Sequence, residues 1–374
     1  MSTKWKSEEL EPGKVLETTF FRNPVGDSPY PFRATHLDGR RAPRVVLSDD
    51  PRIRPGVPTQ VRIVAVHKPE RNDRGWVQIE YVAARELQLD GIYLDPMVTR
   101  KLQVLLESGL NILLDGPQGS GKTTMVRAIA RTLGMEFVFF NCAAVLDATD
   151  FMATIQVRAS ESGAPVTDFV PTDLRNALLA AVAAPARRFL VFLDELNRCP
   201  ESARNALMPA LDATRRIFDP VTNQFIAIPD NIQFVAAVNR GRQFSGTFGI
   251  DAAQLDRFAP LQVDYLPAEE EVKLLQGRHP EVSKNTLETV VTIANALRRN
   301  PDLQTGLSVR ATEEVCVYLK HPLMENADRG TLAEILKSSF CGRLDGRYDD
   351  ASTDAGVAWA AITAALEETA RAGS

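Results

Sequence analysis

Apolar residues in the first 90 positions fall into short runs that alternate with polar residues or are rich in β-branched side chains. These runs are Lys14 to Phe21, Arg44 to Leu47, Val61 to Val66 and Trp76 to Val82. Pro and Gly separate them, a pattern that predicts strands rather than helices. The last two runs flank the polar stretch His67 to Gly75, which predicts a hairpin with a charged tip. We expect a β-rich N-terminal domain over residues 1–90, and a small barrel is one way to close it.

From Asp90 onward, short apolar runs alternate with segments of helical periodicity. Each run is too short for a helix, so we expect five buried strands: Asn111 to Leu114, Phe137 to Phe140, Phe189 to Leu193, Ile232 to Val238 and Leu261 to Val263. The run Phe137 to Phe140 is interpreted as core, because parallel strands covered on both faces are continuously apolar. The pattern predicts an α/β domain with a parallel sheet over residues 91–266.

From Pro267 onward only helical patterns remain. They cover Ala268 to Leu275, Thr286 to Arg298, Arg310 to Leu319, Thr331 to Ser338 and Gly356 to Ala372. We therefore expect residues 267–374 to form a helical lid and C-terminal helices after the sheet.

Composition narrows the possible functions. The 374 residues carry a net charge of −5, and residues 1–90 hold 15 basic against 13 acidic side chains, without the positive excess typical of nucleic-acid binding. The four cysteines are scattered, which argues against disulfide frameworks and zinc ribbons. The N-terminus is polar, and no stretch approaches the ~20 apolar residues of a membrane span. We expect a soluble, cytoplasmic protein.

A phosphate-binding loop follows the first strand of the predicted sheet. The loop has the G-x-x-x-x-G-K-[ST] pattern and reads Gly116, Pro117, Gln118, Gly119, Ser120, Gly121, Lys122 and Thr123, with Thr124 next in the following helix. Glycines let backbone N–H groups surround phosphate oxygens, and the helix adds its positive N-terminal end. Lys122 is expected to reach the β and γ phosphates, and Thr123 to bind Mg²⁺.

Two acids end the apolar run Phe189 to Leu193. Asp194 and Glu195 would be costly at the end of a buried strand unless they met a cation. We expect Asp194 to hold Mg²⁺ and Glu195 to orient or deprotonate the attacking water. The alternative is that the pair caps the next helix, but after a phosphate loop it favours hydrolysis over kinase chemistry.

Three further polar residues are candidates for sensing the γ-phosphate. Asn239 ends the run Ile232 to Val238 and can bond the attacking water, although Asn is also common in turns after strands. Arg257 precedes the last strand and can stabilise phosphate charge, or it can pair with Asp256 at the surface. Arg310 opens a lid helix at its positive end, where an anion is the favourable neighbour.

Taken in order, these residues resemble the Walker A, Walker B, sensor 1, arginine finger and sensor 2 motifs of the AAA+ ATPases. The run Leu193 to Arg198 is similar to the MoxR branch, and Phe244 to Thr247 with Leu255 to Phe258 is similar to the ATPase subunits of cobalt chelatase and denitrification activators. The resemblance covers residues 92–320. One departure is Val309, which stands where that branch usually has proline.

Two inserts also fit the MoxR branch. Residues Thr154 to Asp168 resemble the hairpin inserted in helix 2, and Arg216 to Ile228, with a turn at Pro220 to Asn223, resemble the hairpin before sensor 1. In the family such hairpins face the pore or the substrate; the plainer interpretation is two surface hairpins. The first insert is polar, without an aromatic residue between Thr154 and Val166, which argues against a processive unfoldase.

The resemblance implies an ATP hydrolase that uses Mg²⁺ and works as a homo-oligomeric ring, expected to be a hexamer. Such a ring would remodel or activate a partner protein, which in this branch often carries a von Willebrand factor A domain; no membrane partner is expected. The alternative is a nucleic-acid-directed motor or defence-system NTPase, with the N-terminal domain as reader. A scaffold that does not hydrolyse nucleotide would require a broken motif, and every motif is present.

Overall fold

The computed structural model describes residues 12–13, 15–22, 32–34, 44–47, 58–67, 76–82, 87–159, 165–239, 249–303, 307–324 and 328–372. The chain divides into two compact units. One comprises residues 1–87 with 100–110, and the other comprises residues 88–99 with 111–374. The domain boundaries expected near residues 90 and 266 stay predictions.

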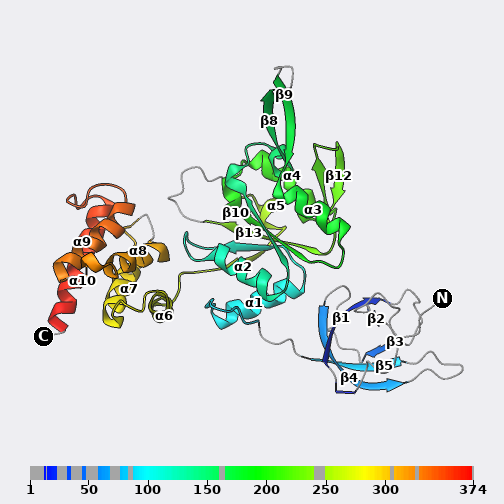
Figure 1. Cartoon of the computed structure of the whole chain (residues 1–374), viewed down its shortest axis with the longest axis horizontal. Helices are drawn as coiled ribbons and strands as arrows, with labels where there is room; N and C mark the ends of the chain where they lie inside the picture. Colours follow the sequence, from blue (N-terminus) through cyan, green and yellow to red (C-terminus); the bar gives the residue numbers. More distant parts are fainter. Residues whose placement is uncertain are drawn as a thin grey trace, which may run out of the picture. The chain divides into compact units, whose positions relative to one another are not determined.

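The N-terminal strands close into a five-stranded barrel (Figure 1). Its strands are β1 (Val15–Arg22), β2 (Phe32–Ala34), β3 (Arg44–Leu47), β4 (Pro58–His67) and β5 (Trp76–Tyr81). Around the barrel they follow the order β1-β2-β3-β5-β4, and β3 with β5 is the parallel pair. The side chains of Val61, Ile63, Val77 and Ile79 are buried at alternate positions. The pairing of β4 with β5 confirms the expected hairpin, whose tip lies outside the described residues.

Five parallel strands form the sheet of the second unit. They are β6 (Ile112–Asp115), β7 (Glu136–Asn141), β10 (Phe189–Asp194), β13 (Ile232–Val238) and β14 (Ala259–Gln262). The order across the sheet is β14-β6-β13-β10-β7. The helices of this unit that accompany the sheet are α2 (Lys122–Thr132), α3 (Asp173–Ala183), α4 (Glu201–Leu211) and the short α5 (Ala252–Leu255), and α1 (Pro96–Glu107) precedes β6 in the chain. The predicted parallel sheet with flanking helices is confirmed.

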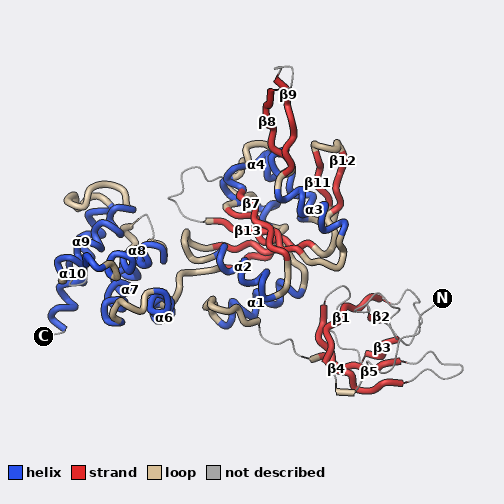
Figure 2. The backbone as a smooth tube through the Cα atoms, in the orientation of Figure 1, coloured by secondary structure: helices blue, strands red, loops and turns tan. Residues whose placement is uncertain are grey.

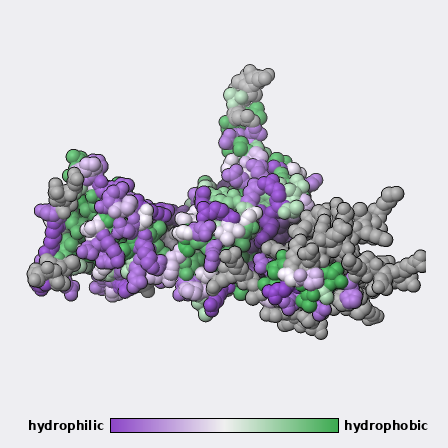
Figure 3. Space-filling model, turned by 60° about the horizontal axis from the view of Figure 1, so that its bottom comes forward, coloured by the Kyte–Doolittle hydropathy of each residue, from purple (hydrophilic) through white to green (hydrophobic). Residues whose placement is uncertain are grey.

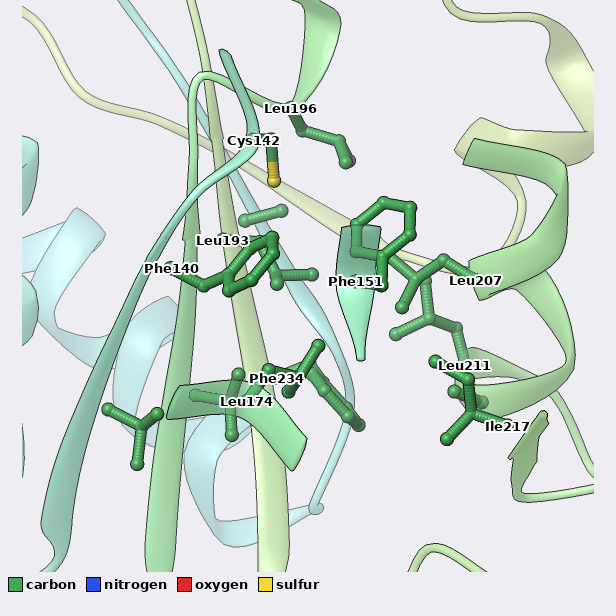
Figure 4. Close-up of a cluster of buried hydrophobic side chains, with 14 of the residues drawn as sticks. Phe140, Cys142, Phe151, Leu174, Leu193, Leu196, Leu207, Leu211, Ile217 and Phe234 are labelled. Carbon is green, nitrogen blue, oxygen red and sulfur yellow. The ribbon is translucent and has the colours of Figure 1, made fainter. Parts of the chain in front are cut away.

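The core of this α/β domain includes side chains from the sheet and from helices α3 and α4 (Figure 4). Phe140 and Phe151 stack with ring centroids 5.6 Å apart. Residues 189–193 of β10 are all buried, because the strand has a neighbour on each side and apolar layers on both faces. This central position fixes the end of β10, where the two acids lie.

Phe139 departs from the expectation that its run belongs entirely to the core. It is 39% exposed, and burial along β7 alternates after Phe137. The reason is that β7 is the last strand in the sheet order, with β10 as its neighbour on one side. The prediction of a uniformly buried strand was therefore wrong at Phe139.

Two hairpins extend from the same end of the α/β domain (Figures 1 and 2). The first pairs β8 (Ala153–Ala159) with β9 (Pro165–Pro171), and the second pairs β11 (Arg216–Asp219) with β12 (Gln224–Ala227). Both expected hairpins are confirmed, and residues 160–164, between β8 and β9, lie outside the described residues.

A buried ion pair links α3, the helix that follows the first hairpin, to the second hairpin. Arg175, in the first turn of the helix that follows β9, donates from Nε and Nη2 to the two carboxylate oxygens of Asp219, both at 2.9 Å. Thr222 and the Val221 amide also donate to this carboxylate. Burial alone would raise the pKa of Asp219, but these hydrogen bonds outweigh it and hold the pKa below its usual value.

The helical lid consists of α6 (Ala268–Arg278), α7 (Lys284–Arg299), α8 (Val309–Leu319), α9 (Arg329–Phe340) and α10 (Asp354–Ala372). Every helix predicted after Pro267 is present, with ends shifted by up to three residues. Short 3-10 turns occur at Cys142–Ala144, Ala148–Phe151, Leu196–Arg198, Pro322–Met324 and Cys341–Arg343. Among the described residues, no helix combines the length and apolar character that crossing a membrane requires.

Candidate functional site

The phosphate-binding loop lies between the end of β6 and the start of α2. Gly119 and Gly121 have φ angles of 75° and 84°, in the left-handed region that favours glycine. A Cβ atom on Gly116 would lie 1.9 Å from the Val263 carbonyl oxygen. Backbone conformation and close packing thus explain why the loop needs glycine at these three positions.

Lys122 is buried at the centre of this loop. Its Nζ donates to the carbonyl oxygens of Gly116 and Pro117 at 2.8 and 2.9 Å, and to Oδ1 of Asn239 at 2.8 Å. Burial lowers the pKa of Lys122 to about 8, while the nearby carboxylates of Asp194, Asp115 and Glu195 act in the opposite direction. The structure therefore brings the lysine and the expected sensor amide into direct contact.

Asp194 lies beside the first residues of α2. Its Oδ2 accepts a 3.2 Å hydrogen bond from Thr123 Oγ1, and its Oδ1 accepts from the Glu195 amide at 3.0 Å. Glu195 has φ 53° and ψ 41°, a left-handed conformation that costs about 1 kcal/mol for a residue other than glycine. Its carboxylate pairs with Arg198 at 3.5 Å. The expected capping alternative is not observed, since Glu195 makes no side-chain cap.

Asn197 is a member of this site that the sequence interpretation missed. It is buried, and its Nδ2 donates to the Asn239 carbonyl oxygen at 2.9 Å, while its Oδ1 has no hydrogen-bond partner. The sequence could have identified Asn197 as a site residue by its position, because it lies two residues after Glu195 in the run that resembles the MoxR branch. Asn197 ties the end of β13 to the segment after β10.

The residues present fit a nucleotide with a magnesium ion. Ser120 Oγ is buried in the loop without a hydrogen-bond partner, as expected of a group awaiting a phosphate oxygen. Thr123 and Asp194 offer one hydroxyl and one carboxylate oxygen at the same point, the hard donors that Mg²⁺ prefers. A pocket of about 730 Å³ lies next to Gly116 and Pro117, with Tyr93 and Tyr265 also in its lining.

Arg257 lies apart from this cluster. It follows α5 by two residues, and its guanidinium contacts Asp212 at 3.8 Å and the Ala253 carbonyl oxygen. The expected alternative partner, Asp256, is not the one used. No hydrogen bond or ion pair of Arg257 reaches Lys122 or Asp194, so within one chain it does not join the phosphate site.

Arg310 is exposed and is the second residue of α8, which confirms its place at a helix N-terminus. Ser308, two residues earlier, packs against Gly119: a Cβ on that glycine would lie 2.2 Å from the Ser308 Cβ. The lid segment with Arg310 thus begins next to the phosphate-binding loop. Of the other resemblance residues, Phe244 to Thr247 lie outside the described residues.

A family model matches the residues that build this site. Residues 111–258 match the family model of the AAA domain, dynein-related subfamily. An uncharacterized protein of Staphylococcus saprophyticus is 25% identical over 241 residues, 64% of this chain and 86% of the relative. An uncharacterized protein of Staphylococcus aureus strain USA300 is 24% identical over 253 residues, 65% of this chain and 90% of the relative.

Similar solved structures include the Thermotoga maritima RuvB Holliday junction branch migration motor, with 18% identity, a TM-score of 0.42 and coverage of 67% of this chain and 71% of that one. NtrX from Brucella abortus in complex with ADP has 16% identity, a TM-score of 0.41 and coverage of 63% and 52%. The family match covers the same residues that build the phosphate loop, the two acids and Asn239. The chain therefore carries an AAA+ ATPase domain over residues 111–258, a domain that binds and hydrolyses ATP.

Proposed function

We propose that this chain is a MoxR-type AAA+ ATPase that assembles into a hexameric ring and uses ATP hydrolysis to remodel or activate a partner protein. The observation that carries the proposal is the convergence of Lys122, Asn239, Asp194 and Thr123 in an ATPase domain that also bears two projecting hairpins. A partner with a von Willebrand factor A domain is the first kind to test.

In this proposal each residue of the site has a separate task. Lys122 and the loop amides hold the β and γ phosphates, while the pocket beside Gly116 receives the base. Mg²⁺, held by Thr123 and Asp194, would neutralise phosphate charge. Glu195 orients or deprotonates the attacking water, and Asn239 bonds that water or the γ-phosphate. Arg310, at the start of α8, supplies positive charge to the phosphate of its own subunit, and Arg257 supplies it to the phosphate of a neighbouring subunit in the ring.

The hairpins support a protein client more than the sequence alone indicated. The first hairpin was expected to be polar, yet Ile155 and Val157 are 56% and 69% exposed, and Phe169, directly opposite Ile155, is 40% exposed. Figure 3 shows hydrophobic residues along this projection beside hydrophilic ones. On the second hairpin, Phe218 and Phe225 are exposed with ring centroids 5.6 Å apart. Exposed apolar groups of this kind favour contact with protein side chains.

The proposal is tested with two variants that separate binding from hydrolysis. Lys122→Ala removes a contact to ground-state phosphates and should abolish ATP binding, whereas Glu195→Gln should bind ATP and lose about 10²-fold or more of turnover. The Glu195→Gln protein should therefore form stable rings with ATP and retain its client during purification. The Lys122→Ala protein is the matched control and should retain neither. Near-normal turnover in Glu195→Gln, or proteins retained equally by both variants, would contradict the proposal.

A further inference from the structure

Arg298, in the lid helix α7, is a nearly buried cation whose side chain is 3% exposed. Its Nη1 and Nη2 donate to the two carboxylate oxygens of Glu271 at 2.5 and 3.0 Å. Its Nε donates to the Leu307 carbonyl oxygen at 2.6 Å, and its guanidinium lies 4.7 Å from the ring centroid of Tyr265. One side chain thus contacts α6, the residue two positions before α8, and the segment between sheet and lid.

Glu271 extends these contacts into α8. It is fully buried and also accepts a 2.7 Å hydrogen bond from Thr312 Oγ1. Thr312 is itself fully buried and lies two residues after Arg310. A buried carboxylate is tolerated when its oxygens are paired, and here Arg298 and Thr312 supply the partners. The position of the first turn of α8 is therefore fixed through Glu271 and Arg298.

Two contacts connect this group to the phosphate-binding loop. Tyr265 Oη donates to the Gln118 carbonyl oxygen at 3.3 Å, and Ser308 packs against Gly119. Arg298 touches both connections, since it lies over the Tyr265 ring and bonds the carbonyl immediately before Ser308. A continuous path of contacts runs from the phosphate loop through Arg298 to the helix that carries Arg310.

We propose that Arg298 is a positioning residue for ATP hydrolysis: it holds the first turn of α8, and with it Arg310, against the phosphate-binding loop. The proposal rests on the role given to Arg310 in the proposed function, but not on a ring, a client or a partner. Weakening the Arg298 contacts should leave ATP bound by Lys122 and the loop, while Arg310 loses its fixed place. The effect should therefore appear in kcat more than in KM.

The first experiment uses Arg298→Lys, which keeps the charge and loses both the two-pronged bond to Glu271 and the planar contact with Tyr265. We expect kcat to fall about 10-fold, because small misplacements of catalytic groups have large effects on rate. In an Arg310→Ala background the same change should have no further effect on kcat. Arg299→Lys, on the exposed next position of α7, is the matched control. An equal loss in both backgrounds would overturn the proposal.

The second experiment needs no turnover, so it separates this proposal from failure of the proposed function. Hydrogen exchange is followed in Glu195→Gln protein with and without ATP. We expect ATP to slow exchange in both the phosphate loop and the first turn of α8, and Arg298→Lys to abolish the second effect alone. Should circular dichroism show a lowered melting temperature for Arg298→Lys, Thr312→Val removes the hydrogen bond from α8 to Glu271 and leaves the Arg298–Glu271 pair intact. Retained α8 protection in a folded variant would refute the proposal.

Discussion

Lys122 and Asn239 are 117 positions apart in the sequence, yet their side chains share a 2.8 Å hydrogen bond. The contact follows from the sheet order, because β13 pairs directly with β6 and the two strands end side by side. Because β6 and β13 are parallel, their carboxyl ends lie at the same edge of the sheet. The phosphate-binding loop after β6 therefore meets Asn239, which follows β13. The two groups expected to bind the γ-phosphate are therefore within hydrogen-bond distance of each other.

Nucleotide binding should depend on pH through Lys122. Burial lowers its pKa to about 8, and a bound phosphate would raise it again. Below about pH 7 the lysine is charged with or without ATP, so this group contributes no pH dependence. Above about pH 8 the free protein loses the proton, so binding should take up a proton and the affinity should fall as pH rises.

Titration calorimetry in two buffers of different protonation enthalpy measures this uptake directly. The Lys122→Arg protein, whose guanidinium stays charged, is the control and should show no uptake from this group. Identical heats in both buffers at about pH 9 would contradict the assignment.

Replacing Asn239 should affect turnover more than binding. We expect Asn239→Ala to lower kcat about 10²-fold, as removal of a single transition-state hydrogen bond commonly does. Lys122 keeps its bonds to two carbonyl oxygens in the variant, so KM for ATP should change little. Steady-state kinetics decide the point: a raised KM with unchanged kcat would make Asn239 a ground-state ligand.

Arg257 should act on the nucleotide of a neighbouring subunit. Its contacts within the chain are with Asp212 and Ala253, away from the phosphate loop. Arg257→Ala should bind ATP and lose about 10³-fold in rate. Mixing it with Lys122→Ala subunits should restore part of the activity, because an intact site can then face an intact arginine. No recovery in rings shown to be mixed would exclude this role.

The Arg175–Asp219 pair should be a large stability determinant. Removing one partner leaves the other charge buried, so Arg175→Met should lower the free energy of unfolding by about 3 kcal/mol. Arg187→Met breaks an exposed ion pair with Glu136 and should cost less than about 1 kcal/mol. Urea unfolding of both proteins gives the comparison. Equal losses would show that burial of the pair is energetically unimportant.

The first hairpin should matter for the client and not for basal hydrolysis. Replacing Gln156 to Val166 by a short Gly/Ser turn removes the exposed Val157 and leaves Lys122, Asp194 and Asn239 untouched. We expect unchanged ATP hydrolysis and lost remodelling of the partner. If hydrolysis and ring assembly fail together, the hairpin is structural.

Local patterns predicted much of the fold, because burial along the chain is strongly periodic. The strand Ile232 to Val238 was predicted to the residue, since all seven positions are buried and all but Gln233 are apolar. Strand Phe32–Ala34 was missed because three residues show no period. Phe139 was assigned to the core because edge and central strands have the same composition.

Some features of the site could be predicted from local sequence patterns, and others could not. The loop glycines, Lys122, Thr123 and the two acids follow from spacing, since their chemistry requires neighbours in sequence. Asn197 and the contact between Gly119 and Ser308 depend on segments that meet after folding. No local pattern encodes that meeting, so the bond from Asn197 to Asn239 and the contact of Ser308 with Gly119 emerged from the structure alone.

The buried bond between Arg175 and Asp219 has a mechanical consequence. A pull on the first hairpin passes along β9 into Thr172, which caps the helix that bears Arg175. The guanidinium delivers that load to Asp219, at the end of β11 where the second hairpin turns. When force is applied to the first hairpin, the two hairpins would then move together as one rigid unit rather than independently.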